Sequence, residues 1–308
     1  MVEEVDGGPI APGPPRPAGP SIRGVGEPRF RWRVGPHLLE CGARTHVMGV
    51  VNVTPDSFSD GGRFLDPAVA IEHGRRLAAE GADLIDVGGE STRPGADPVP
   101  VDEELARVLP VVEGLAATVD VPVSIDTRRG AVARAAIAEG AWVVNDVTGG
   151  RDPDLLGAAA DSGAGLVLMH MLGDPRTMQA DPRYDDVVAE ILTYLGRRLA
   201  AAVQAGVSKE HVALDPGLGF GKTLQHNLVL MRDIAAFAEL GRPVVVGPSR
   251  KSFIGAVLDG APVDERLDGT AGAVAWLAGR GAHVVRVHDV REMARVVRVV
   301  DAIARAGA

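Results

Sequence analysis

Polar and charged residues stand at the ends of short apolar runs in this sequence, and their types suit one kind of ligand. Acidic and amide side chains at fixed, nearby points would hold a flat heterocycle with several N–H groups. Basic side chains would hold an anion or a carbonyl oxygen. The acceptors are Asp126, Asn145 and Asp215, and the donors are Lys251, Arg286 and His288. Together they predict a ligand with a polar heterocycle and a phosphate-like tail.

The elements that must position these residues form a repeating pattern. From Thr45 onward, eight short β-branched runs alternate with alanine-rich amphipathic stretches. Strands that alternate with helices pair in parallel, and near-continuous apolar strands indicate burial on both faces. Eight such units predict an α/β fold, a (β/α)₈ TIM barrel, in which all the carboxyl ends of the strands meet at one rim. A doubly wound open sheet is the alternative, but no glycine-rich dinucleotide turn marks its switch point.

The chain divides into three parts by composition. Residues 1–27 are expected to be a disordered tail, because ten of the first twenty residues are Gly or Pro. Residues 28–44 read as a short β-hairpin that closes the base of the barrel. Residues 45–308 are expected to form the barrel itself.

Charge and cysteine content limit the partners and the compartment. The net charge of −9 among 308 residues disfavours a general nucleic-acid surface. The single cysteine, Cys41, cannot form an intramolecular disulfide, which suits a reducing cytoplasm. Acidic residues near the N-terminus do not fit a signal peptide, and no apolar run is long enough to span a bilayer. A cytoplasmic protein with neither a nucleic-acid nor a membrane partner is expected.

Several other polar residues have a structural interpretation. Lys222 lies in GFGKT, but the spacing of the phosphate-loop motif fails, so we interpret this lysine as structural. Asp86 falls inside the second run and is expected to hydrogen-bond its neighbours. His170 ends a run, and pocket lining and structural support both remain open for it. Asp146 and Asp289 are expected to support neighbouring loops. No nucleophile–base pair stands out, which favours leaving-group stabilisation over covalent catalysis.

Eight motifs in order resemble those of the dihydropteroate synthase family. They are MGVVNVTPDSFSDGG, DVGGESTRPGA, SIDT, NDVTGG, LVLMHMLGDPRTMQ, LDPGLGFGKTLQHN, GPSRKSFIG and RVHDV. The resemblance covers the chain from about Thr45 to its end. It implies a (β/α)₈ barrel, usually a homodimer, that joins (7,8-dihydropterin-6-yl)methyl diphosphate to 4-aminobenzoate and releases diphosphate.

The resemblance also implies a role for individual residues. Those implied for the pterin are Asp126, Asn145, Asp215, Lys251, Met169, Phe220 and Gly247. Those implied for the diphosphate are Arg286, His288 and Thr92, with Asn52 as a ligand of Mg²⁺. Those implied for 4-aminobenzoate are Arg93, Pro94 and Ser252, beside Lys251. The catalytic set is Asp126, Lys251, Arg286 and His288.

The connection after Asn52 is interpreted as a mobile lid over the site, by analogy with the family. We expect Asp56 or Asp60 to pair with Arg93 when this lid closes. Two alternative functions remain open on the sequence. A pterin-binding methyltransferase domain would have no diphosphate to neutralise, and a non-catalytic pterin-binding protein would have lost Lys251, Arg286 or Asn52.

Overall fold

Eight parallel strands form the central sheet of the protein, in a computed structural model that describes residues 29–54, 66–91 and 95–306. The strands are β3 (His46–Asn52), β4 (Leu84–Gly88), β5 (Val123–Asp126), β6 (Val143–Asp146), β7 (Gly165–Met169), β8 (Val212–Asp215), β9 (Val245–Val246) and β10 (Val284–Val287). Their order is β8-β7-β6-β5-β4-β3-β10-β9, and every pairing is parallel. A bridge between Leu214 and Val244 joins the two outer strands. The predicted (β/α)₈ barrel is confirmed.

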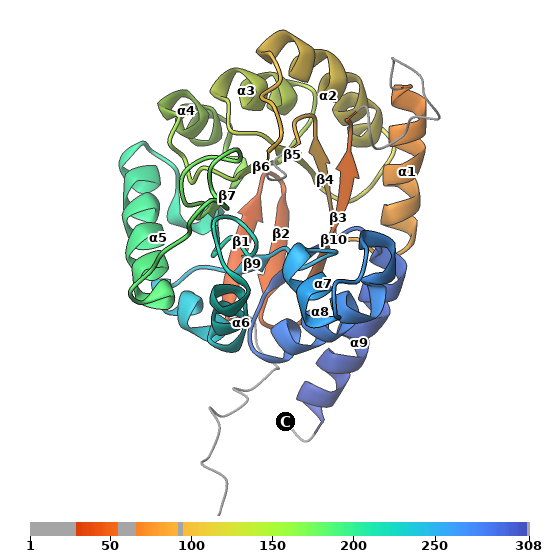
Figure 1. Ribbon diagram of the computed structural model, residues 1–308. Coiled ribbons are helices and arrows are strands. Elements are labelled where there is room, and N and C mark those ends of the chain that lie inside the picture. The colour runs from red at the N-terminus through yellow and green to blue at the C-terminus, as the bar shows by residue number, and fades with distance from the viewer. Residues whose placement is uncertain (1–28, 55–65, 92–94, 307–308) are drawn as a thin grey trace, which may run out of the picture.

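Helices surround the strands on the outside of the ring (Figure 1). The α-helices are α1 (Pro67–Ala79), α2 (Val101–Ala116), α3 (Gly130–Ala138), α4 (Pro153–Ser162), α5 (Val187–Gln204), α6 (Leu224–Arg232), α7 (Ser252–Val257), α8 (Leu267–Gly279) and α9 (Val290–Arg305). Short 3₁₀ helices are η1 (Lys209–His211), η2 (Ile234–Leu240) and η3 (Val263–Glu265). In the described part of the chain, no helix is both long enough and apolar enough to cross a membrane.

Local sequence signals start several of these helices. Asp66 precedes Pro67, and its side chain accepts a hydrogen bond from a backbone N–H in the first turn of α1. Asp152 and Pro153 begin α4 in the same way. An aspartate cap satisfies a free N–H group, and proline at the first position lacks the N–H that would otherwise stay unpaired. These caps fix where each helix begins after its strand.

The predicted N-terminal hairpin is present as β1 (Phe30–Val34) and β2 (His37–Cys41), which pair antiparallel. Trp32 is fully buried, and its Nε1 donates a hydrogen bond to the carbonyl of His211 at 2.8 Å. One apolar cluster unites hairpin residues with residues of seven barrel strands, including Met48 and Leu84. The hairpin therefore packs against one end of the barrel interior. The predicted tail, residues 1–27, lies outside the described residues.

Side chains alternate between the two faces of each strand, and this places the polar rim residues next to the apolar cluster, nearer the carboxyl ends of the strands. Successive side chains of a strand point to opposite faces, so residues two apart share a face. Cluster members Leu84, Val143, Val167, Ala213, Val245 and Val284 are each followed, two positions later, by Asp86, Asn145, Met169, Asp215, Gly247 and Arg286. The interior is thus apolar at the hairpin end and becomes polar one layer further toward the carboxyl ends of the strands.

Candidate active site

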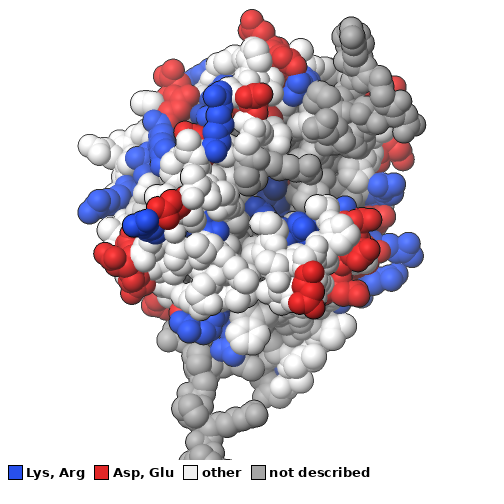
Figure 2. Space-filling model, viewed as in Figure 1, with Lys and Arg blue, Asp and Glu red and all other residues white. Residues whose placement is uncertain are grey.

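One cleft at the carboxyl ends of the strands gathers most of the predicted site residues. Its empty volume is about 480 Å³, with the solvent-filled mouth included. It is lined by Asp126, Asn145, Val147, Met169, Asp215, Gly217, Leu218, Phe220, Gly247, Ser249, Lys251, Arg286 and His288. Basic side chains are visible in a hollow near the middle of this face (Figure 2).

Arg286 lies at the centre of a polar network that joins four strands, β10, β4, β5 and β6. Its Nε donates to Oδ2 of Asp86 at 2.6 Å, and its Nη2 donates to Oδ2 of Asp126 at 2.8 Å. The same Oδ2 of Asp86 accepts from the amide of Asn145 at 3.0 Å. Asp86 is fully buried, as its position inside β4 predicts, and its Oδ1 has no partner among the described residues. This carboxylate therefore orients both Arg286 and Asn145.

Burial changes the acidity of the carboxyl groups in the cleft. It raises the pKa of Asp126, while the Arg286 guanidinium opposes that rise. Burial also raises the pKa of Asp215 to about 6, against the hydrogen bond that Asp215 accepts from the backbone N–H of Gly217 at 2.6 Å. A buried carboxylate is costly unless cations or N–H groups surround it. Both groups are poised to gain stabilisation from a ligand with N–H donors or positive charge.

Lys251 extends over an aromatic ring at the edge of the cleft. Its Nζ lies 4.0 Å from the centroid of the Phe220 ring, a distance typical of a cation–π contact. Burial, followed by the nearby Arg286, lowers the pKa of Lys251 to about 8. Lys251 and Phe220 together form a wall that is both apolar and cationic, which suits the binding of a flat ring.

The residue before Lys251 has a strained backbone. Arg250 has φ of +57°, in the left-handed region that non-glycine residues rarely adopt. Its N–H donates to Oγ1 of Thr270, and its guanidinium forms an ion pair with Asp289 at 2.5 Å. These contacts hold the turn that directs Lys251 toward the cleft, and they give Asp289 the supporting role expected from the sequence.

Ser249 and His288 contact each other in the wall of the same cleft. Oγ of Ser249 lies 3.0 Å from Nδ1 of His288 and accepts the backbone N–H of His288 at 3.2 Å. Burial, followed by the positive charges of Arg286 and Arg250, lowers the pKa of His288 to about 3. The imidazole is therefore neutral around pH 7, and Arg286 and Lys251 carry the positive charge of this region.

A buried lysine, Lys222, supports the loop after β8. Nζ of Lys222 donates to the carbonyl of Phe220 at 2.8 Å and lies 3.0 Å from Nδ1 of His170. Burial lowers the pKa of Lys222 well below its usual value, and the nearby Asp215 opposes this shift. Neither Lys222 nor His170 lines the cleft. Both connect the end of β7 to the loop that carries Phe220, which is a supporting role.

The remaining predicted residues lie elsewhere. Asn52 ends β3 and shares the inward face of that strand with Met48, but it does not line the cleft. Ser252 begins α7 directly after Lys251 and also stands outside the lining. Other predicted residues lie outside the described residues, namely Thr92, Arg93, Pro94, Asp56 and Asp60.

Known proteins resemble this chain over most of its length. The sequence profile of the family described as pterin binding enzyme matches residues 48–288. Dihydropteroate synthase of Escherichia coli strain K12 is 49% identical over 257 residues, which cover 83% of this chain and 91% of the relative. The chain belongs to the dihydropteroate synthase family.

Solved structures from this family have the same fold. A Xanthomonas albilineans dihydropteroate synthase with 4-aminobenzoic acid is 46% identical, with a TM-score of 0.84 over 90% of this chain and 98% of that one. A Burkholderia cenocepacia dihydropteroate synthase complexed with 7,8-dihydropteroate is 43% identical, with a TM-score of 0.82 over 90% and 97%.

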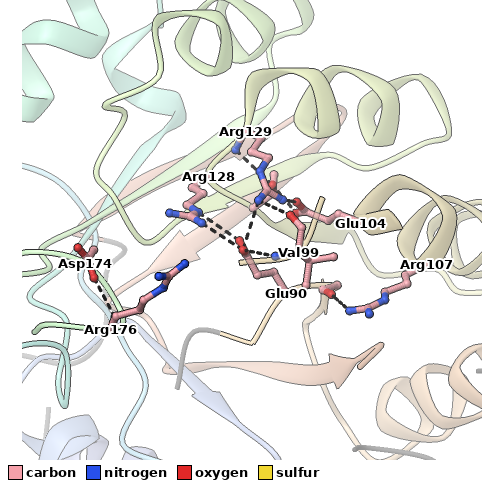
Figure 3. A network of polar contacts seen from close by, with 10 residues as sticks. Glu90, Val99, Glu104, Arg107, Arg128, Arg129, Asp174 and Arg176 are labelled. Atoms are coloured by element: carbon pink, nitrogen blue, oxygen red, sulfur yellow. Dashed lines mark hydrogen bonds and ion pairs between the residues drawn. The ribbon is translucent and has the colours of Figure 1, made fainter. Parts of the chain in front are cut away.

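A network of arginines and glutamates supports the rim beside the cleft in this member of the dihydropteroate synthase family (Figure 3). Glu90 accepts hydrogen bonds from Arg128, from Arg129 and from the backbone N–H of Val99. Arg129 also pairs with Glu104, whose side chain is fully buried. Because Glu90 and Val99 flank the STRPGADP stretch, the network holds together the two ends of the connection that contains Thr92, Arg93 and Pro94.

Four residues that line the cleft were not singled out from the sequence, namely Val147, Gly217, Leu218 and Ser249. Each lies within or next to a motif shared with the dihydropteroate synthase family. Ser249 is the first residue of SRK and could have been found from that signal. Val147 and Leu218 carry no polar atom in their side chains, so residue type alone gave no reason to select them.

Proposed function

We propose that this chain condenses (7,8-dihydropterin-6-yl)methyl diphosphate with 4-aminobenzoate to give 7,8-dihydropteroate and diphosphate. The observation that carries the proposal is the joint lining of one cleft by acidic, amide and basic side chains, in a chain of the dihydropteroate synthase family. The solved relatives with 4-aminobenzoic acid and 7,8-dihydropteroate support the same substrate and product.

The pterin half of the site would bind the ring and favour positive charge on it. Asn145 and Asp215 would accept hydrogen bonds from the ring, and Lys251 with Phe220 would form its wall. Asp126 would stabilise the positive charge that develops on the ring and its exocyclic methylene as the leaving group departs. Fixed charges act strongly in a buried site because little solvent reorganises during the reaction.

The basic half of the site would assist the departure of diphosphate. The C–O bond breaks with its electron pair going to the diphosphate, and Arg286 would neutralise part of the growing charge. The amine of 4-aminobenzoate then forms the new C–N bond and releases one proton to solvent. An arylamine is a neutral nucleophile, so no strong base is required.

We also propose Mg²⁺ as a cofactor, held by the side-chain oxygen of Asn52. The donor set fits, because Mg²⁺ takes oxygen ligands and commonly binds through few protein groups together with substrate phosphates and water. Within the described residues no cluster of three His, Cys, Asp or Glu side chains offers an all-protein metal site. When bound, the ion would withdraw charge from the diphosphate oxygens.

Diphosphate release tests the function directly. The purified protein is given the pterin diphosphate with and without 4-aminobenzoate and with and without Mg²⁺. We expect release that requires both additions and is matched by 7,8-dihydropteroate formation. A complete lack of release in every condition would overturn the proposal, and release that does not require Mg²⁺ would overturn its role alone.

We further propose that the enzyme is a cytoplasmic homodimer. Exposed apolar side chains of α7, η3 and the start of α8 support a dimer surface, namely Val257, Leu258, Val263 and Leu267. Sedimentation equilibrium measures the mass of the particle in solution, and a monomer at micromolar concentration would contradict the dimer.

The single cysteine supports the cytoplasmic location. Burial raises the pKa of the Cys41 thiol to about 12, which makes this thiol a poor nucleophile. This fits a structural cysteine in a reducing compartment.

A further inference from the structure

Ser249 and His288 form a buried contact on the basic side of the cleft. Both side chains line the cleft, and Ser249 is only 5% exposed. Oγ of Ser249 lies 3.0 Å from Nδ1 of His288 and 3.2 Å from the backbone nitrogen of the same residue. The serine hydroxyl is thus held by two atoms of His288, one on the backbone and one on the ring.

The two contacts together favour one arrangement of the protons. A backbone N–H can only donate, so Oγ of Ser249 accepts that bond. Among the described residues, Nδ1 of His288 is the one acceptor that the structure places within hydrogen-bonding distance of the hydroxyl. The arrangement in which the O–H group donates to Nδ1 gives the hydroxyl proton an acceptor within the protein, and in it Nδ1 carries a lone pair and no proton. A neutral imidazole then carries its proton on Nε2.

The remaining ring nitrogen is available to a ligand. Nε2 of His288 has no hydrogen-bond partner in the described part of the chain, and it does not belong to the fully buried atoms that lack one. It is therefore open to the cleft. Burial lowers the pKa of the imidazole most, the charges of Arg286, Arg250 and Lys251 lower it further, and Asp289 opposes them. The ring consequently stays neutral in the pH range where the tautomer matters.

We propose that Ser249 is a positioning residue that fixes His288 as the Nε2–H tautomer, so that this nitrogen donates a hydrogen bond to the departing diphosphate. The catalytic part of this role rests on the proposed function. The opposite tautomer would turn a lone pair toward the anion and repel it. A neutral donor adds a hydrogen bond without adding a further charge beside Arg286 and Lys251, as other neutral histidines do at developing oxyanions.

Nuclear magnetic resonance of the histidine rings tests the tautomer without any reference to activity. The protein is labelled with ¹⁵N-histidine, and the ring of His288 is assigned by its loss in His288→Gln. Long-range ¹H–¹⁵N spectra near pH 7.5 distinguish a protonated ring nitrogen from one with a lone pair. We expect Nε2–H in the unaltered protein and in Ser249→Thr, and a mixture of both tautomers in Ser249→Ala. A proton on Nδ1 in the unaltered protein would overturn the proposal.

Kinetics test what the tautomer does. Loss of one neutral hydrogen bond is expected to lower kcat about three- to tenfold in Ser249→Ala. The KM for 4-aminobenzoate should change less than twofold, because the proposed function places His288 at the diphosphate and not at this substrate. Ser249→Thr keeps the hydroxyl and should restore kcat. Ser124→Ala is the matched control, since Ser124 is also buried and its hydroxyl has no partner among the described residues; it should change neither kcat nor the tautomer.

A double-mutant cycle separates positioning from a merely structural role. The side-chain amide of His288→Gln donates from nearly the same place as Nε2 and has no tautomers. Ser249→Ala should therefore lower kcat by less than twofold in that background. An equal loss in both backgrounds would overturn the positioning role. Nε2–H in a protein that releases no diphosphate would support the tautomer assignment and overturn the proposed function instead.

Discussion

At the scale of single residues, the site depends on charges that would be costly without one another. Asp86, Asp126 and Arg286 form a buried set in which one guanidinium contacts two carboxylates. Removing one member leaves another charge poorly compensated in a buried place. The same set could bind the proposed substrate, because Arg286 can donate hydrogen bonds to a diphosphate while Asp126 accepts hydrogen bonds from the pterin.

Asp126→Asn is expected to lower kcat at least tenfold. The amide keeps the shape of the side chain but removes the negative charge that favours positive charge on the pterin. Steady-state diphosphate release measures the change. Asp161→Asn is the control, because Asp161 pairs with Arg134 at an exposed site where ion pairs contribute little. Comparable losses of kcat in the two variants would show that the charge of Asp126 is unimportant.

The lowered pKa of Lys251 predicts how kcat/KM changes at alkaline pH. Burial lowers its pKa to about 8, so the ammonium group is lost as the pH rises through that value, and kcat/KM should fall there. Folding responds with the opposite sign. Between about pH 8 and 10.5 the unfolded chain binds more protons at Lys251 than the folded protein, so this group makes stability rise with pH. Unfolding caused by Lys251 therefore cannot explain the loss of activity.

The variant Lys251→Arg tests this assignment. A guanidinium keeps its charge well above pH 10, so any activity that remains should persist to higher pH. A pH profile of kcat/KM for the pterin diphosphate measures the shift. Lys209→Arg, at an exposed lysine of η1, should leave the profile unchanged. An alkaline limb that stays near pH 8 in Lys251→Arg would assign it to another group.

At the scale of elements, the loop after β8 shows how tightly a connection can be packed against its neighbour. Gly217 has φ of +70°, and a Cβ built there would lie 2.0 Å from the carbonyl oxygen of His170. Gly217→Ala is therefore expected to destabilise the fold by about 3 kcal/mol or more, through backbone strain and a clash that backbone atoms must absorb. Urea unfolding measures the stability, and pterin affinity should fall with it.

Gly260 provides the comparison that isolates the clash. It also has positive φ, at +90°, but no atom lies within 4 Å of a Cβ built there. Gly260→Ala should cost only about 1–2 kcal/mol, the usual penalty for a left-handed backbone without glycine. If the two variants lost equal stability, packing against His170 would not be the reason for glycine at position 217.

The elements also show what could be predicted from the sequence. Strand periodicity and the polar ends of the runs were sufficient to place Asp126, Asn145 and Asp215 at one rim, because parallel strands present their carboxyl ends together. The contacts of Arg286 with Asp86 and of Ser249 with His288 join residues 200 and 39 positions apart. Such pairs depend on strand register and side-chain direction, which neither composition nor periodicity determines.

At the scale of the whole molecule, the barrel separates a layer that holds the fold together from a layer that does chemistry. The hairpin β1–β2 packs into the end of the interior that is opposite the polar cleft, and its core residue is Trp32. On most of these strands, a residue of the apolar layer is followed two positions later by a residue of the cleft layer. Stability and substrate binding should therefore respond to different substitutions, even though the same strands carry both.

Trp32→Ala is expected to cost about 3–5 kcal/mol of stability, because it empties a fully buried site and leaves the carbonyl of His211 without its donor. Leu38 is on the same hairpin, but its side chain is 44% exposed. Leu38→Ala should therefore lower the free energy of unfolding by less than about 1 kcal/mol. Urea unfolding compares the two, and kcat and pterin affinity are measured at low temperature, where both variants remain folded. We expect activity to be kept in each. Loss of activity in folded Trp32→Ala would mean that the hairpin end of the barrel also positions the cleft, and the two layers would then not be independent.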